Sequence, residues 1–171
     1  MSYVDLHVHS NASDGTLSPE QVVRLAHEAG LSAIALTDHD TTAGVAGAAE
    51  AGAELGLEVV PGIEVSSSFR DHEIHILGLF VDTDSPSLQA ALKEFRQHRD
   101  QRNQEMLGRF DAHGIHLTAE DLCAGNPDTV ITRAHVARAL LAKGLGPDLD
   151  HIFKKYLQYG GIYCPPKEFL P

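Results

Sequence analysis

The chain of 171 residues is long enough for one domain with a substantial core. Its 24 acidic and 13 basic side chains give a net charge of −11 at pH 7, which argues against a protein that coats nucleic acid through a basic surface. The sequence has no apolar run of about 18 residues, no basic-then-apolar leader and too few cysteines for a disulfide scaffold. It therefore argues against membrane insertion or secretion and predicts a cytoplasmic protein.

The first predicted element is an extended strand in the stretch 3–10. Alternate side chains of a strand share a face, so Asp5, His7 and His9 point one way. The apolar side chains of the other face, which we expect to pack under helices, are Val4, Leu6 and Val8. Two imidazoles on one face, with Asp14 brought back beside them by the following loop, form a potential metal site. Two solvated histidines on a surface strand are the alternative interpretation.

Strand and helix patterns then alternate with short connections, which predicts a parallel βα unit with right-handed crossovers. The predicted elements are a helix from Ser18 to Gly30, a strand at 33–36, a helix near 42–55 and a strand at 58–66 kinked at Pro61. Side chains at the carboxyl ends of parallel strands gather at one edge of the sheet. The polar residues at these ends, which we expect to share a site, are His7, His9, Asp38, His39, Asp40 and Glu64.

A fourth strand is predicted at residues 72–80. His75 shares a face of this strand with Leu77 and Leu79, so its imidazole is able to reach toward the same site. A histidine that is hydrogen-bonded within the core is the alternative.

Helical patterns fill the second half of the chain. A long polar helix is predicted from Pro86 to His113, and its Arg96, Arg99 and Arg102 form either a solvated face or a phosphate clamp. Shorter helices are predicted near 118, from Thr132 to Gly144 and near 147–157. Cations are disfavoured in the first turn of a helix, yet Arg133 and His135 both lie there in the second of these helices. An anion bound at that helix start would resolve the mismatch.

Six segments together resemble the PHP (polymerase and histidinol phosphatase) family of metal-dependent phosphoesterases. They are D-L-H-V-H-S-x-x-S-D-G at 5–15, L-T-D-H-D-T at 36–41, P-G-I-E-V-S at 61–66, H-E-I-H-I-L-G at 72–78, I-T-R-A-H-V-A-R-A-L at 131–140 and F-K-K-Y-L at 153–157. The last two segments resemble the bacterial branch that acts on nucleotides, which includes 3′,5′-nucleoside bisphosphate phosphatases and exoribonucleases working from 5′-phosphorylated ends.

The resemblance implies an α/β fold, a distorted (β/α)7 barrel with a small helical insertion, of which this chain represents the amino-terminal portion. We expect residues 1–94 to be barrel, 95–160 to be the helical insertion, and 161–171 to lead back to the barrel. The later Ala-His-Pro and Ser-Asp-x-His motifs of the family do not occur here. We therefore expect the chain to be part of a longer protein.

The resemblance also implies a site with two or three divalent ions, manganese foremost, with zinc, iron or magnesium as alternatives. Carried over by position, the metal ligands are His7, His9, Asp14, His39, Glu64 and His75. The four of these that take part most directly in catalysis are His7, His9, His39 and Glu64. Arg133 and His135 match positions that hold the substrate phosphate. Asp38 and Asp40 flank a ligand and are expected either to orient the ligands by hydrogen bonds or to belong to the structure of the barrel.

The implied function is hydrolysis of a phosphate ester on a nucleotide or short 5′-phosphorylated RNA by a metal-bound hydroxide. Three alternatives stay open: a histidinol-phosphate phosphatase, a PHP module that binds partners without catalysis, and an amidohydrolase, which shares the H-x-H pattern on a barrel strand. A nucleotide or RNA end is thus the expected partner, and neither a membrane nor bulk nucleic acid is expected.

Overall fold

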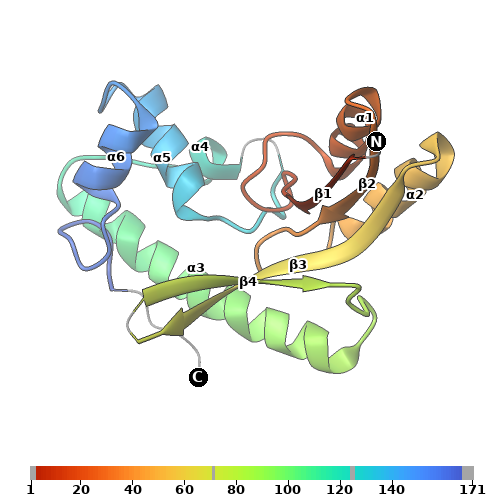
Figure 1. Cartoon of the computed structure of the whole chain (residues 1–171). Helices are drawn as coiled ribbons and strands as arrows, with labels where there is room; N and C mark the ends of the chain where they lie inside the picture. The colour runs from red at the N-terminus through yellow and green to blue at the C-terminus, as the bar shows by residue number, and fades with distance from the viewer. Residues whose placement is uncertain (1–2, 71, 124–125, 167–171) are drawn as a thin grey trace. The chain divides into compact units, whose positions relative to one another are not determined.

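The structure is a computed structural model, and it describes residues 3–70, 72–123 and 126–166 (Figure 1). The chain forms two compact units, residues 1–94 and 95–171. Among the described residues, none of the helices combines the length and apolar character needed to cross a bilayer.

The first unit contains a four-stranded sheet in the order β1-β2-β3-β4. Its strands are β1 (Tyr3–Val8), β2 (Leu31–Leu36), β3 (Glu58–Phe69) and β4 (His72–Leu79). The first three strands are parallel, as predicted, and β4 runs antiparallel to β3. This alternation of strands and helices confirms the α/β class.

Two helices connect the parallel strands, α1 (Pro19–Glu28) and α2 (Val45–Leu55). Ser18 begins α1 with a capping box, because its side chain accepts from the Gln21 amide while the Gln21 side chain accepts from the Ser18 amide. Buried side chains from both helices and the strands between them form the core of this unit. They include Val23, Ala26, Ile34, Leu36, Ala48 and Leu57.

The apolar face of β1 differs from the expectation. Val8 packs against the core, but the Val4 and Leu6 side chains are 55% and 40% exposed. Among the described residues β1 pairs only with β2, so the helices on the core side do not reach its outer residues. The prediction that helices cover Val4 and Leu6 is therefore wrong for the described chain.

At Pro61 the strand that pairs with β3 changes from β2 to β4, and β3 itself continues without a break. Residues 58–61 pair with β2, and the ladder with β4 begins at Gly62. The proline thus stands where one ladder ends and the other begins, a position in which its missing N–H does little harm.

The second unit is helical. The division between the units falls within α3 (Pro86–Ala112), which is followed by α4 (Ala119–Cys123), α5 (Arg133–Ala142) and α6 (Leu149–Tyr156). The largest fully buried side chains of its core are Met106, Phe110, Leu122, Leu140, Ile152 and Leu157. Tyr163 and Cys164 pack against the same core, so the segment predicted to lead back to the barrel begins as part of this unit. The remainder, 167–171, lies outside the described residues.

Candidate metal centre

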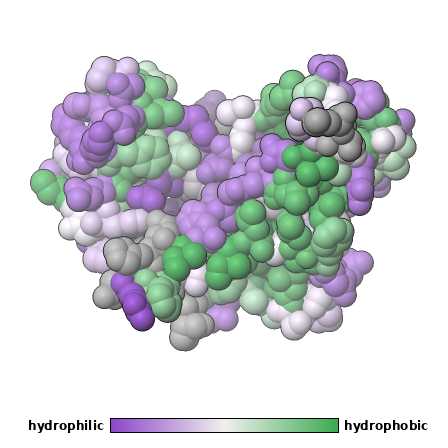
Figure 2. Space-filling model, viewed as in Figure 1, coloured by the Kyte–Doolittle hydropathy of each residue, from purple (hydrophilic) through white to green (hydrophobic). Residues whose placement is uncertain are grey.

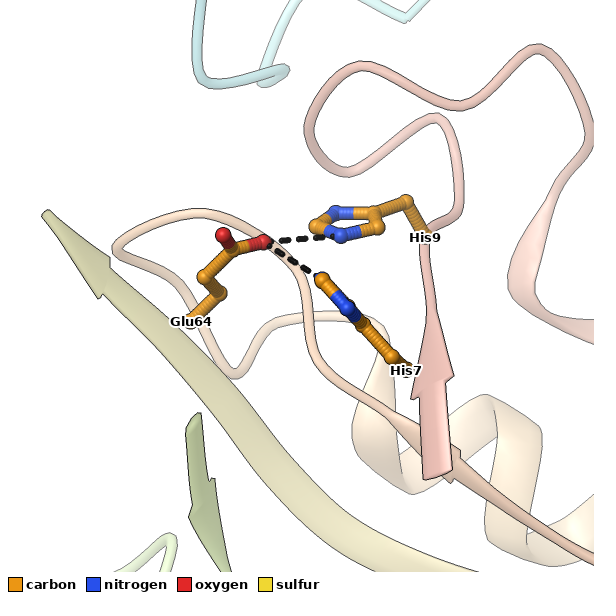
Figure 3. A group of neighbouring side chains, drawn as sticks. All are labelled: His7, His9 and Glu64. Atoms are coloured by element: carbon orange, nitrogen blue, oxygen red, sulfur yellow. Dashed lines mark hydrogen bonds and ion pairs between the residues drawn. The ribbon is translucent and has the colours of Figure 1, made fainter. Parts of the chain in front are cut away.

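The Glu64 carboxylate lies at the centre of a group of imidazoles in the first unit. The Nε2 atoms of His7, on β1, and of His9, directly after β1, lie 2.9 Å from Glu64 Oε2. Figure 3 shows the ring of His7, on β1, and the ring of His9, just after it, pointing toward this one oxygen on β3. The carboxylate is buried. Segments on either side of β2 in the sheet therefore direct two nitrogens and one oxygen at a common point.

Two further imidazoles approach Glu64. His75 Nδ1, from β4, lies 2.5 Å from Oε1, and His39 Nδ1 lies 3.7 Å from Oε2. The backbone holds His39 in place, because Asp40 N–H donates to Glu64 O (3.0 Å) and Glu64 N–H donates to Asp38 O (3.2 Å). His75 thus lies beside Glu64 with a side chain that is 37% exposed, unlike that of a core histidine, and its role as a metal ligand stays a prediction.

The loop after β1 brings Asp14 to the same place. Asp14 Oδ1 lies 3.5 Å from His9 Nδ1, and its Oδ2 lies 3.4 Å from His39 Nε2. Gly15 makes the return possible, because its N–H donates to Ser10 O (2.8 Å) and a Cβ there would lie only 2.5 Å from His9 O. Any side chain at this position would push the loop and Asp14 away.

A buried carboxylate fixes this loop to the end of β2. Asp38 accepts hydrogen bonds from Ser10 N–H (2.8 Å), Ser10 Oγ (2.6 Å) and Ser13 Oγ (2.6 Å). All three residues are almost completely buried. Ser13 Oγ also lies 3.4 Å from His9 Nδ1, so the network orients one imidazole as well as the loop. Asp38 had been predicted as a supporting residue, but the two serines had not.

The electrostatics favour a neutral His9 imidazole and an ionised Glu64 carboxylate. Burial lowers the pKa of His9, and the neighbouring His39 lowers it further. Burial by itself would raise the pKa of Glu64, but the hydrogen bond from His7 and the nearby histidines outweigh it, so the pKa is lowered. A neutral imidazole and a carboxylate are the protonation states that bind metal ions.

The donor atoms fit divalent ions. They form three overlapping groups, in each of which the ligand atoms lie within 4.8 Å of one another: His7, His9 and Glu64; His9, Asp14 and His39; and His39, Glu64 and His75. His39 Nδ1 is buried and has no hydrogen-bond partner among the described residues, an arrangement that a bound ion would satisfy. Nitrogen and oxygen donors together suit manganese, iron and zinc.

Arg133 and His135 belong to the second unit, where α5 begins. Thr132 and His135 form a capping box, in which His135 Nδ1 accepts from Thr132 N–H (3.1 Å). This nitrogen is therefore unprotonated, and the ring resolves the apparent conflict with the helix dipole by accepting a hydrogen bond there. The sequence signal was the T-x-x-H spacing, which has a histidine where a capping box usually has Glu or Gln.

Comparison with known proteins identifies the family. A family model of the PHP domain matches residues 5–161. The chain belongs to the PHP domain family. The resemblance inferred from the six sequence segments is thereby confirmed.

Individual members of this family are similar to the chain over most of its length. It is 40% identical over 162 residues to a 3′,5′-nucleoside bisphosphate phosphatase of Chromobacterium violaceum, covering 94% of this chain and 56% of the relative. It is 40% identical over 169 residues to the 5′-3′ exoribonuclease Rnm of Escherichia coli K12, covering 95% and 57%. The chain thus spans somewhat more than half the length of these PHP proteins.

A solved PHP-like structure has the same fold. It is described as an amidohydrolase from Chromobacterium violaceum with bound sulfate and no metal, and it matches 98% of this chain and 59% of its own. The TM-score is 0.89 at 38% sequence identity. This match supports the expectation of a partial PHP barrel.

Proposed function

We propose that the protein is a metal-dependent phosphoesterase that hydrolyses phosphate esters of nucleotides or of short 5′-phosphorylated RNA. The observation that carries this proposal is the convergence of four imidazoles on the buried carboxylate of Glu64, with Asp14 beside two of them, His9 and His39. A serine or cysteine nucleophile is not required by such a site.

Two or three divalent ions, with manganese foremost, would occupy the overlapping groups, with Glu64 shared between two of them. Ions bound there would lower the pKa of a coordinated water and offset the negative charge of the phosphate. The chain itself keeps Glu64 ionised, favours the neutral form of His9 and holds Asp14 through the Asp38 network. These residues position the ligands before an ion binds, which lowers the free-energy cost of assembling the site.

The relatives support phosphate esters of nucleotides as the substrate class. One is named for 3′,5′-nucleoside bisphosphates and another for RNA, which favours the nucleotide branch over histidinol phosphate. On this proposal, Arg133 and His135 hold the substrate phosphate, and the protein works in the cytoplasm. Complementary charge from Arg133 and a hydrogen bond from the neutral His135 are the interactions that such a phosphate would use.

Glu64→Gln tests the proposal. The substitution keeps the size of the side chain but removes its charge, so the purified protein should lose manganese on dialysis and should no longer release phosphate from adenosine 3′,5′-bisphosphate. Glu50→Gln, an equivalent change at an exposed position of α2, should leave both properties unchanged. Turnover in Glu64→Gln equal to that of the unchanged protein would rule out this site.

The amidohydrolase description of the similar structure favours a second candidate, hydrolysis of a C–N bond. Side-by-side assays with adenosine 3′,5′-bisphosphate and a panel of amides separate the two. Activity on an amide without activity on the phosphate ester would replace the proposed function. A protein that retains metal and lacks both activities would instead indicate a PHP module that binds partners without catalysis.

A further inference from the structure

The two nitrogens of the His9 ring face different groups of potential ligands. Nε2 lies 2.9 Å from Glu64 Oε2, and His7 Nε2 lies at the same distance from that oxygen (Figure 3). Nδ1 lies 3.5 Å from Asp14 Oδ1, whose carboxylate also approaches His39. A neutral imidazole has one ring proton, so only the nitrogen without it offers a lone pair to an ion. The position of this proton therefore decides which group His9 joins.

Ser13 is placed to fix the proton. This residue is completely buried, and its Oγ donates to Asp38 Oδ1 (2.6 Å). Ser10 N–H donates to the same oxygen (2.8 Å), so Oδ1 is an acceptor and the single hydroxyl hydrogen of Ser13 is used in its bond to Asp38. Toward His9 Nδ1, 3.4 Å away, Ser13 Oγ is therefore an acceptor.

The surroundings of the ring favour a proton on Nδ1. An ionised Asp14 is, like Ser13 Oγ, an acceptor on this side of the ring. Nε2 also faces an acceptor, but the Glu64 carboxylate already accepts hydrogen bonds from His7 at Oε2 and from His75 at Oε1. Among the described residues, Ser13 is the one whose contact with the His9 ring has the geometry of a hydrogen bond. The proton is therefore expected on Nδ1.

We propose that Ser13 is a positioning residue, which keeps the proton of His9 on Nδ1 and leaves the lone pair of Nε2 free for an ion held with His7 and Glu64. The hydrogen bond at one ring nitrogen of a histidine determines which nitrogen binds a metal. The same bond excludes Nδ1 as a ligand on the side of Asp14. Of the two groups of donor atoms that include His9, it therefore serves the one with His7 and Glu64. This inference rests on the proposed function, since the position of the proton matters only if an ion binds there.

The test locates the proton directly, without metal and without turnover. The full chain, with isotope-labelled histidines and freed of metal by a chelator, is studied by long-range proton–nitrogen NMR at pH 8, where an ordinary imidazole is neutral. The signals of the His9 ring are those that disappear in His9→Asn. They should show the proton on Nδ1, and a proton on Nε2 in the unchanged protein would overturn the proposal.

Ser13→Ala and Ser10→Ala form a matched pair. Each removes a buried hydroxyl that donates to Asp38 over 2.6 Å, but among the described residues only the hydroxyl of Ser13 is hydrogen-bonded to the His9 ring. In Ser13→Ala the proton should shift toward Nε2, because Glu64 Oε2 is then the nearest acceptor of the ring. In Ser10→Ala it should stay on Nδ1. No shift in Ser13→Ala, or an equal shift in both variants, would overturn the proposal.

Manganese affinity provides a second measurement. Calorimetric titration of the metal-free proteins should show that Ser13→Ala binds its first manganese ion roughly ten- to hundredfold more weakly than the unchanged protein. Ser87→Ala, the same change at an exposed position of α3, should bind normally. An unaltered affinity in Ser13→Ala would overturn the role in positioning. Neither measurement depends on hydrolysis, so a failure here is distinguishable from a failure of the proposed function, which Glu64→Gln tests by turnover.

Discussion

At the scale of single residues, Asp38 fixes the position of the loop that carries the predicted ligand Asp14. Its carboxylate accepts three hydrogen bonds from the loop that carries Asp14. Burial raises the pKa of Asp38, and the hydrogen bonds from Ser10 and Ser13 offset only part of that effect. Burial of the ionised carboxylate therefore lowers the free energy of unfolding, whereas its hydrogen bonds raise it.

Replacing Asp38 separates these two contributions. Asp38→Ala leaves three buried donors without an acceptor and should lower the free energy of unfolding by about 2–4 kcal/mol. Asp38→Asn keeps an oxygen facing Ser10 N–H and Ser13 Oγ, and it removes the buried charge, so it should lower stability by less than about 1.5 kcal/mol. Urea unfolding of the two metal-free variants measures the difference. Equal losses would show that the hydrogen bonds do not hold the loop.

The pKa of His9 predicts how the stability of the metal-free protein depends on pH. Because burial lowers this pKa, the unfolded chain binds the proton more readily than the folded chain does. Stability should therefore rise with pH between the folded pKa and the ordinary value near 6.5, with a slope of at most about 1.4 kcal/mol per pH unit from this group. Below the folded pKa its contribution is lost.

His9→Asn provides the comparison for this prediction. Urea unfolding between pH 5 and pH 8 should show a smaller slope for the variant than for the unchanged protein. Exposed His27 on α1 serves as the control, since His27→Asn should leave the slope unaltered. A slope in His9→Asn as steep as in the unchanged protein would mean that other groups govern this pH range.

Much of the site could be predicted at this scale, and the reasons are specific. His7 and Glu64 lie within strands of recognisable pattern, His9 and His39 follow such strands, and parallel strands bring their carboxyl ends together. Ser10 and Ser13 could not be assigned, because a serine in a loop is as often solvated as buried. Their partner, Asp38, lies far away in the sequence, and only the folded chain shows the contact.

At the scale of the elements, two glycines show how the same substitution acts in opposite directions. Gly56 ends α2 in the left-handed conformation (φ 71°), so Gly56→Ala should lower the free energy of unfolding by about 1 kcal/mol. Gly108 lies exposed within α3 with open space around its Cα, so Gly108→Ala should raise it by about 0.5–1 kcal/mol. Thermal unfolding of both variants measures the signs. Two changes of the same sign would contradict the assigned conformations.

The starts of helices could be predicted from the sequence, but the direction of a strand could not. The helices α1, α3 and α5 begin within a residue or so of their predicted caps, because capping residues are local signals. The direction of β4 was not predicted, since the alternation of apolar residues is the same for parallel and antiparallel strands. This direction matters to the site, because the antiparallel register directs His75 at Glu64.

At the scale of the whole molecule, the sheet of the first unit exposes apolar side chains. Figure 2 shows apolar surface gathered over β1 and the strands beside it. The large apolar residues that β1 and β4 expose are Tyr3, Val4, Leu6, Ile74, Ile76 and Leu77. β1 is also an edge strand of the described sheet, with backbone groups that no other described strand pairs. An apolar edge strand promotes association with other chains.

The chain of 171 residues should therefore bind an apolar dye and associate as its concentration rises. Val4→Thr combined with Leu6→Thr keeps the strand preference of β1 and removes much of its apolar surface, so both effects should weaken. Leu25→Gln, at a similarly exposed position among polar residues of α1, should change neither. Dye fluorescence and sedimentation velocity measure the two effects. Unaltered association in the double variant would mean that another surface mediates it, since the β1 face would then contribute nothing measurable.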